Sequence, residues 1–566
     1  MARIASFLKR RIDILILFFI WLYSSALHFL WLTMDKKPPW GDGISFILRG
    51  LHLTHIQKIY GWGELAKSFF NFDVIYPSPP IIESTYFLYY KIFGLFSDME
   101  MVISSLYLAI GIIGVYGVAR HLFDRYAGLL SALIFTSVPG VIYYSKLGFK
   151  EFHIMCLLAP ALYLLLKADN FRNRRFSILF AIPLAITILI KLEGAIFLIL
   201  PIFFSIAKGF SREVFLKDRS RVTNFVLFFV ISILISSFWY VINFENFMQL
   251  LLDRTGNTAG INSIYFSTKN AGLYAYQLYN EIFSKAQVVI FIAILMYIII
   301  RALLPGVKTL ELRRLTLLSL CFVFPLAVFS FLCAKDASHL LPLIVFASLI
   351  IAGGCSVFRS KTVKYILILV VVFNSLNTLS LQLFAHGSAT DPPTLFARLS
   401  PADYILYNLR ENLRYPYGKE LKIEKRVWRP KLTEIIKFIS QDYKSIKSNG
   451  KPTVLLMSNY EPLRFFQLQY YNEKLGLPVS LLFYCWEMDA FEHSLLGSEY
   501  DYIVLQKPLC FHHPNHPEAN MLKKLYFFIE KNQGKFNLRY KIVKEIELPR
   551  QLKVVIYKRS NLESAQ

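Results

Sequence analysis

About eleven apolar stretches, spread over the first two thirds of the chain, constrain its fold more than any other feature. A transmembrane helix needs about 20 mainly apolar residues, because the hydrocarbon core of a bilayer is about 30 Å thick. The stretches lie at 13–34, 102–120, 126–144, 152–168, 176–192, 194–209, 224–243, 287–303, 315–333, 339–356 and 364–385. Their number and length predict a polytopic α-helical membrane protein over residues 1–385.

The composition of the 566 residues agrees with this fold class. Hydrophobic residues make up 55% of the chain and charged residues 18%, against about 25% charged in a typical soluble protein. The net charge of +24 does not indicate a nucleic-acid partner, because the basic residues cluster in short loops between the apolar stretches. The six cysteines show no spacing typical of a structural zinc site.

The basic clusters also predict which side of the membrane each loop faces. Cytoplasmic loops carry an excess of Lys and Arg. If segment 80–97 lies in the interface instead of spanning, almost every dense basic cluster shares one side with the basic N-terminus. This arrangement predicts a cytoplasmic N-terminus in the cytoplasmic (inner) membrane. The first outer loop, 35–101, then lies outside, with interfacial helices near 43–58 and in 80–97, and so does a long polar loop at 244–286.

Residues 386–566 have the composition of a soluble domain, which the odd number of spans places on the extracytoplasmic (periplasmic) side. Strand-like runs alternate with helical spacing, which predicts a small α/β domain. The expected helices lie at 430–447, 463–474 and 520–532, and the expected strands at 453–457, 478–483, 502–505, 540–547 and 551–558. Cys485 and Cys510 could form a disulfide there or stay free, and the sequence leaves both readings open.

The loop that follows the first apolar stretch carries two carboxylates, Asp35 and Asp42. Asp42 precedes Gly-Ile-Ser-Phe-Ile-Leu, a pattern that fits a helix N-cap, and a capping carboxylate can also face a cleft. A general base at the membrane surface is therefore the second interpretation of Asp42. Asp35 is expected to be a solvated interfacial charge.

Further charged residues stand where outer loops meet apolar stretches. Glu151 is expected near the first turn of a helix, which is favourable for a carboxylate in any case. Its neighbours Lys146 and Lys150 could instead hold an anionic head group while Glu151 orients an acceptor.

Lys191 and Glu193 interrupt an apolar region, where charges are costly and often functional. A local ion pair, or a snorkelling lysine, is the simpler interpretation. His339 begins another apolar stretch, where it could face water or donate a hydrogen bond to a phosphate.

In this order, these residues resemble the motifs of the GT-C superfamily of membrane glycosyltransferases. The likeness is to bacterial relatives of protein O-mannosyltransferases and of the lipid A aminoarabinose transferase. It rests on Trp40-Gly-Asp42-Gly, Tyr76-Pro-Ser-Pro79-Pro80, Phe93-Gly94, Ala119-Arg120 to Gly128, Lys150-Glu151, Ile190-Lys191-Leu-Glu-Gly194 and His339-Leu-Leu-Pro342. The chain departs from the family pattern at Gly43 (usually Glu), Ser78 (Lys in the aminoarabinose branch), Glu151 (usually Asp) and His339 (Arg-Tyr).

The resemblance implies an inverting transfer of a sugar from a polyprenyl-phosphate donor to an acceptor glycan, lipid or protein. Asp42 would be the catalytic base and Glu151 a second catalytic acid that positions the acceptor or the basic groups. The candidate donor-phosphate ligands are Lys146, Lys150, Lys191 and His339. No cofactor is required, although a divalent metal could lie between Asp42 and Glu151. A transporter or flippase of a lipid-linked saccharide is the alternative, and a non-enzymatic membrane scaffold is a third class.

Overall fold

The computed structural model divides the chain into two compact units. One, here called the helical unit, comprises Met1–Leu32, Tyr60–Thr85 and Met101–Lys422, and the other, here called the mixed unit, comprises Thr33–Ile59, Tyr86–Glu100 and Ile423–Gln566. The structure describes residues 2–34, 43–71, 79–94, 102–209, 219–246, 248–249, 268–303, 309–331, 337–358, 360–384, 428–447, 450–458, 465–483, 500–508, 517–548 and 552–560.

Each apolar stretch predicted from the sequence coincides with a helix or with a pair of helices. In the helical unit these are α1 (Ala2–Met34), α4 (Ile103–Leu122), α5 (Arg125–Ser137), α6 (Pro139–Leu147), α7 (Lys150–Lys167), α8 (Arg174–Ile190), α9 (Ile196–Gly209), α11 (Arg219–Ile242), α14 (Lys285–Leu303), α15 (Leu310–Phe331), α16 (Leu343–Val357) and α17 (Lys361–Phe384). Short helical elements join them: η2 (Leu192–Ala195), α13 (Thr268–Gln277), η3 (Leu278–Ile282) and η4 (Ala337–Leu340).

Five helices of the described chain are long and apolar enough to cross a membrane, or six if the bent pair α5–α6 is one span. The protein is therefore a multi-pass membrane protein, while the total of eleven spans stays a prediction. The bend of 56° between α5 and α6 falls at Val138, which has an extended backbone. Pro139 explains the break, because a proline disfavours the helical conformation in the residue before it.

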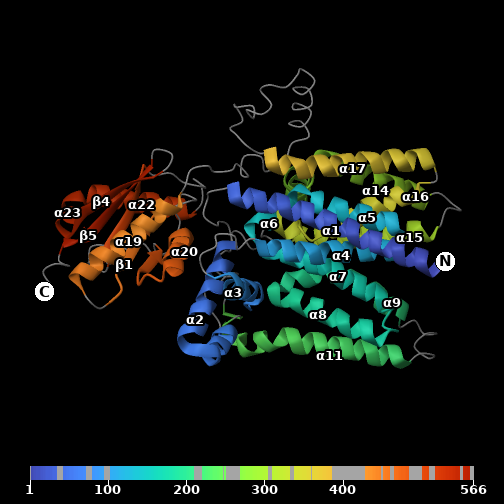
Figure 1. The fold of residues 1–566 in the computed structure, drawn as a ribbon, viewed down its shortest axis with the longest axis horizontal. Coiled ribbons are helices and arrows are strands. Elements are labelled where there is room, and N and C mark those ends of the chain that lie inside the picture. The colour runs from blue at the N-terminus through green and yellow to red at the C-terminus, as the bar shows by residue number, and fades with distance from the viewer. Residues whose placement is uncertain are drawn as a thin grey trace, which may run out of the picture. The chain divides into compact units, whose positions relative to one another are not determined.

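Small residues let the central helices approach closely. Helices α4, α7, α8 and α11 pack in succession, as Figure 1 shows. A Cβ atom at Gly114 of α4 would lie 2.4 Å from the backbone nitrogen of Pro160 in α7, so only glycine fits there. α16 is buried on all sides from Leu343 to Cys355 and forms the core of this unit.

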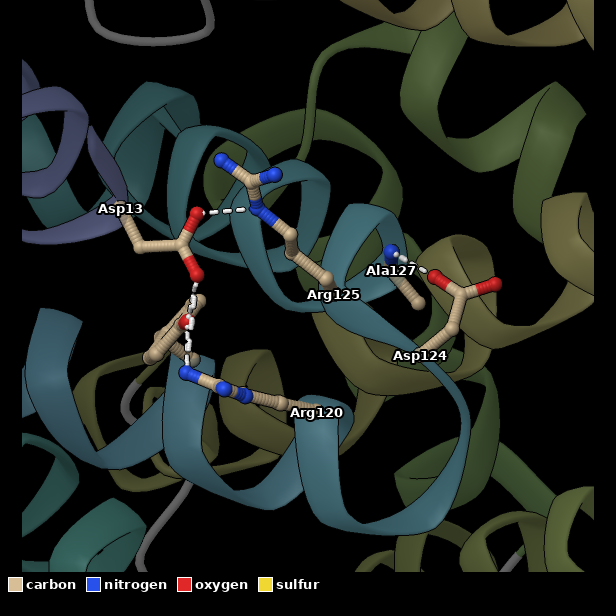
Figure 2. A network of polar contacts seen from close by, with 6 residues as sticks. Asp13, Arg120, Asp124, Arg125 and Ala127 are labelled. Atoms are coloured by element: carbon tan, nitrogen blue, oxygen red, sulfur yellow. Dashed lines mark hydrogen bonds and ion pairs between the residues drawn. The ribbon is translucent and has the colours of Figure 1, made fainter. Parts of the chain in front are cut away.

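A polar network joins α1 to the turn between α4 and α5 (Figure 2). The buried Asp13 carboxylate accepts a hydrogen bond of 2.6 Å from the Tyr116 hydroxyl and pairs with the guanidinium groups of Arg120 and Arg125. Asp124 caps α5 by accepting a hydrogen bond from the Ala127 backbone amide at 2.8 Å. A buried carboxylate needs such partners, so this network fixes the position of α1 against α4 and α5.

The two helices expected in loop 35–101 are present. α2 (Gly43–Phe70) is interrupted at Gly61, whose φ of 84° lies in the region that favours glycine. α3 (Ile81–Phe93) has 13 residues and is therefore about 20 Å long, which is shorter than the hydrocarbon core. This length fits the prediction that segment 80–97 does not cross the membrane.

The mixed unit contains the α/β domain expected for the C-terminal region. Its five-stranded sheet has the order β2-β1-β3-β5-β4, in which β1 pairs in parallel with β2 and β3, and β5 pairs antiparallel with β3 and β4. The elements are α19 (Arg429–Ile446), β1 (Thr453–Met457), α20 (Phe465–Leu475), β2 (Ser480–Phe483), β3 (Tyr502–Lys507), α22 (Pro517–Lys531), α23 (Gln533–Arg539), β4 (Tyr540–Leu548) and β5 (Leu552–Arg559). Every strand and helix predicted there is confirmed, whereas Cys485 and Cys510 lie outside the described residues.

The first half of α2 belongs to the mixed unit and contacts α20 there. The Nδ1 atom of His55 lies 3.3 Å from the Oε2 atom of Glu473. The hydrogen bond with His55 lowers the pKa of the Glu473 carboxyl below its usual value. A segment of residues 35–101 thus contacts the C-terminal domain.

Candidate functional site

The site is built around a sharp break in the chain between α8 and η2. α8 ends at Ile190, and Lys191 has an extended backbone with φ −162° and ψ 124°. The 3₁₀ turn η2 follows at once and carries Glu193. Gly194 allows this turn, because a Cβ atom there would lie 2.6 Å from the Cγ2 atom of Thr187 in α8. The break therefore places Lys191 and Glu193 next to each other at the end of α8.

Glu151 reaches the same place from the start of α7. It is buried and lies in the first turn of α7, where the helix dipole favours a carboxylate. The Nζ atom of Lys191 donates a hydrogen bond of 2.7 Å to its Oε1 atom. The expected helix-terminus interpretation of Glu151 is thus correct, and the carboxylate also has a cationic partner 40 residues further along the chain.

His339 completes a cluster of four side chains. It lies in η4, and its Nδ1 atom is 3.2 Å from the Nζ atom of Lys191. The Oε2 atom of Glu193 is 3.1 Å from Lys191 Nζ and 3.3 Å from His339 Nδ1. Here these four residues, Glu151, Lys191, Glu193 and His339, are called the Lys191 cluster.

The charges in the Lys191 cluster largely cancel. One ammonium faces two carboxylates, so the cluster carries −1 when His339 is neutral and 0 when it is protonated. The two carboxylates beside Lys191 stabilise its ammonium form.

The two carboxylates differ in environment. The Glu151 side chain is 10% exposed and that of Glu193 is 42% exposed. Glu151 is the fixed partner of Lys191, held by a short directed hydrogen bond. Glu193 is the half-exposed partner, although the oxygen that contacts Lys191, Oε2, is buried.

The structure brings three of the six predicted site residues together: Glu151, Lys191 and His339. Lys146 is buried in α6, and Lys150 is half-buried at the first position of α7. Asp42 lies outside the described residues. The roles of Asp42, Lys146 and Lys150 therefore stay predictions.

Sequence reasoning considered Glu193 but did not place it in the site. The local ion pair between Lys191 and Glu193 was one expected interpretation, and it is confirmed. The signal that could have identified Glu193 was its spacing: a Lys and a Glu separated by one apolar residue and followed by a glycine at a helix break. The contact with His339 joins positions far apart in the sequence and had no such signal.

The described residues include no group of three or more His, Cys, Asp or Glu side chains that could hold a metal ion. The metal that the sequence left open would lie between Asp42 and Glu151. Because Asp42 is outside the described residues, this position is not tested.

A sequence family matches part of the helical unit. The family described as "Dolichyl-phosphate-mannose-protein mannosyltransferase" matches residues 78–240, which include Glu151, Lys191 and Glu193. No curated protein sequence is significantly similar to the chain.

Solved structures match nearly the whole chain at low sequence identity. ArnT from Cupriavidus metallidurans bound to undecaprenyl phosphate has a TM-score of 0.56 at 13% identity, with 96% of this chain and 98% of that chain covered. AglB from Archaeoglobus fulgidus, in complex with an inhibitory peptide and a dolichol-phosphate, has a TM-score of 0.53 at 12% identity and coverages of 99% and 77%. Arabinofuranosyltransferase AftD from Mycobacteria has a TM-score of 0.54 at 12% identity and coverages of 96% and 40%. The chain therefore has the fold of the GT-C membrane glycosyltransferases, and the resemblance to this superfamily is confirmed.

Proposed function

We propose that this protein is an inverting glycosyltransferase that moves a sugar from a polyprenyl-phosphate donor to an acceptor at the outer face of the cytoplasmic membrane. The observation that carries the proposal is the Lys191 cluster. Glu151, Lys191 and His339 come from three separate motifs and were selected as site residues from the sequence, and Lys191 lies within hydrogen-bonding distance of both Glu151 and His339. Two of the structures that share the fold contain a polyprenyl phosphate, undecaprenyl phosphate or dolichol-phosphate, which supports this class of donor.

The reaction would be a single displacement. Asp42 takes the proton from the acceptor group as that group attacks the anomeric carbon of the sugar. The new bond forms on the face opposite the phosphate while the carbon–oxygen bond to the phosphate breaks, which inverts the anomeric carbon. The polyprenyl phosphate leaves with the electron pair and gains negative charge, so it needs cationic partners more than a proton donor.

Lys191 and His339 are the proposed partners of that phosphate. Lys191 is suited to the role because Glu151 fixes its position by a hydrogen bond and stabilises its ammonium form. Glu151 acts through Lys191 in this scheme and orients it toward the donor. Lys146 and Lys150 are proposed to extend the cationic surface toward the same phosphate.

The proposed location rests on the distribution of basic residues and on the contact between α2 and α20. His55 belongs to the first outer loop and Glu473 to the C-terminal domain, and their ion pair supports placing both on one side of the membrane. Because the basic N-terminus is expected in the cytoplasm, that side is the outer, periplasmic one. The acceptor would be a glycan, lipid or protein that is exposed there.

The test is transfer by the purified full-length protein. A panel of polyprenyl-phosphate hexoses and pentoses, labelled in the sugar, is incubated with the protein and with envelope fractions as acceptor. We expect acceptor-dependent release of polyprenyl phosphate, and its loss in the Asp42→Asn variant because the amide cannot take the proton. Asp35→Asn, the same change in the same loop, is the matched control and should keep the activity.

Near-normal transfer by Asp42→Asn would refute the assignment of the base. Movement of the labelled lipid across vesicles without release of polyprenyl phosphate would refute the enzyme and support a transporter or flippase.

A further inference from the structure

The Lys191 cluster already contains an anion at the place that the proposed function needs for a phosphate. The Glu193 carboxylate lies 3.1 Å from Lys191 and 3.3 Å from His339, the same two residues proposed to hold the donor. With both carboxylates in place the cluster has no net positive charge. If the cluster did not rearrange, an approaching phosphate would be repelled by the Glu193 carboxylate, which is also negatively charged.

Three features distinguish Glu193 from a fixed structural partner. Its side chain is 42% exposed, whereas Glu151 is 10% exposed. It contacts Lys191 and His339 through one oxygen, Oε2, which is itself buried and lies within ion-pair distance without a directed hydrogen bond, in contrast to the Lys191–Glu151 bond of 2.7 Å. It also lies in a four-residue 3₁₀ turn and not within a long helix.

We propose that Glu193 is an internal counter-anion that competes with the donor phosphate for Lys191 and His339 and is displaced when the donor binds. This inference rests on the proposed function and adds a residue that tunes the affinity for donor and product. Displacement leaves the cluster with a charge of 0 when His339 is neutral and +1 when it is protonated, which suits a phosphate better than the starting charge. After the reaction, return of Glu193 to Lys191 and His339 would favour release of the polyprenyl phosphate product.

The expected change is an increase in the affinity for farnesyl phosphate, which loss of a purely structural residue would not produce. Glu193→Gln keeps the shape of the side chain but removes its charge, so we expect farnesyl phosphate to bind the full-length protein about tenfold more tightly, or about 1.4 kcal/mol. Binding is measured by titration calorimetry in detergent. Farnesol, which lacks the phosphate, should bind the variant and the wild type equally.

Two controls make the result specific. Glu245→Gln, the same substitution at an exposed position near the end of α11, should leave the affinity for farnesyl phosphate unchanged. In a Lys191→Met background, Glu193→Gln should tighten binding by a smaller factor, because one of the two residues for which Glu193 competes is gone.

Unchanged or weaker binding of farnesyl phosphate to Glu193→Gln would overturn the inference while leaving the proposed function in place. A gain in affinity of the same size in the Lys191→Met background would also overturn it. If the wild-type protein did not bind farnesyl phosphate, the proposed function and this inference would both fail.

Discussion

Replacing Lys191 by methionine tests how much the charge of this residue contributes to the folded protein. The substitution removes the ammonium and leaves the buried Glu151 carboxylate without its hydrogen bond of 2.7 Å. Removing one partner of a buried ion pair costs about 3–5 kcal/mol. Because Lys191 is 26% exposed and Glu151 10% exposed, water can partly replace the lost partner. We therefore expect a loss of about 2–3 kcal/mol in the free energy of unfolding.

The double variant Lys191→Met/Glu151→Gln separates stability from function. With the carboxylate neutralised, no uncompensated charge is buried, so most of the lost free energy should return. Binding of farnesyl phosphate should not return, because the cation is still missing. Stability is measured on the full-length protein in mixed micelles, with unfolding by increasing denaturing detergent followed through tryptophan fluorescence.

Lys208→Met serves as the control, because Lys208 is an exposed lysine in the last turn of α9. It should change the free energy of unfolding by less than about 0.5 kcal/mol. The reasoning is refuted if Lys191→Met is as stable as the wild type. It is also refuted if the double variant is no more stable than the single one, because the buried charge of Glu151 would then not be the cause.

Two further changes follow from other contacts. Gly194→Ala would bring a Cβ atom to 2.6 Å from the Cγ2 atom of Thr187, so we expect η2 to shift and the free energy of unfolding to fall by about 1–3 kcal/mol. Farnesyl phosphate should also bind more weakly to this variant. Unchanged affinity in calorimetry would contradict the role given to this turn. The pKa of Glu473 is lowered in the folded protein by His55, so the stability that it contributes is present above the usual pKa of 4.5 and is lost as the pH falls through the lowered value. Glu473→Gln should therefore speed hydrogen exchange in α20 more at about pH 6 than at about pH 3, and an equal effect at both would show that its charge is not responsible.

The sequence was sufficient to predict the elements of both units because the signals that define them are local. Apolar stretches of the right length became helices, and alternating strand and helix patterns became the sheet of the mixed unit. The stretch predicted as a span at 126–144 is bent in the structure, which divides it at Val138 into α5 and α6. Pro139 was a signal for this bend, but a proline within a membrane helix often causes no break when neighbours satisfy the backbone.

The arrangement of the site could be predicted only in part. The motif order selected Glu151, Lys191 and His339, but no local pattern reports a distance between side chains 40 or 148 residues apart. For the same reason the sequence did not indicate that the proposed phosphate partners are already paired with carboxylates. That pairing depends on the angle at which α8 ends and on the close approach of Gly194 to Thr187.

The two acids beside Lys191 differ in how strongly they hold it, and the difference follows from how deeply each acid is buried. A buried acid such as Glu151 cannot leave its cation without a large desolvation penalty, so it holds Lys191 in one place and keeps it charged. A half-exposed acid such as Glu193 gives up its ion pair at a smaller cost, because water can partly replace the lost contact. A lysine with one partner of each kind is oriented before a ligand binds, and it can exchange its more weakly held carboxylate for the ligand phosphate. With this combination, Lys191 would stabilise the folded protein and also bind the ligand, and it would have an anionic partner both in the free protein and in the donor-bound protein.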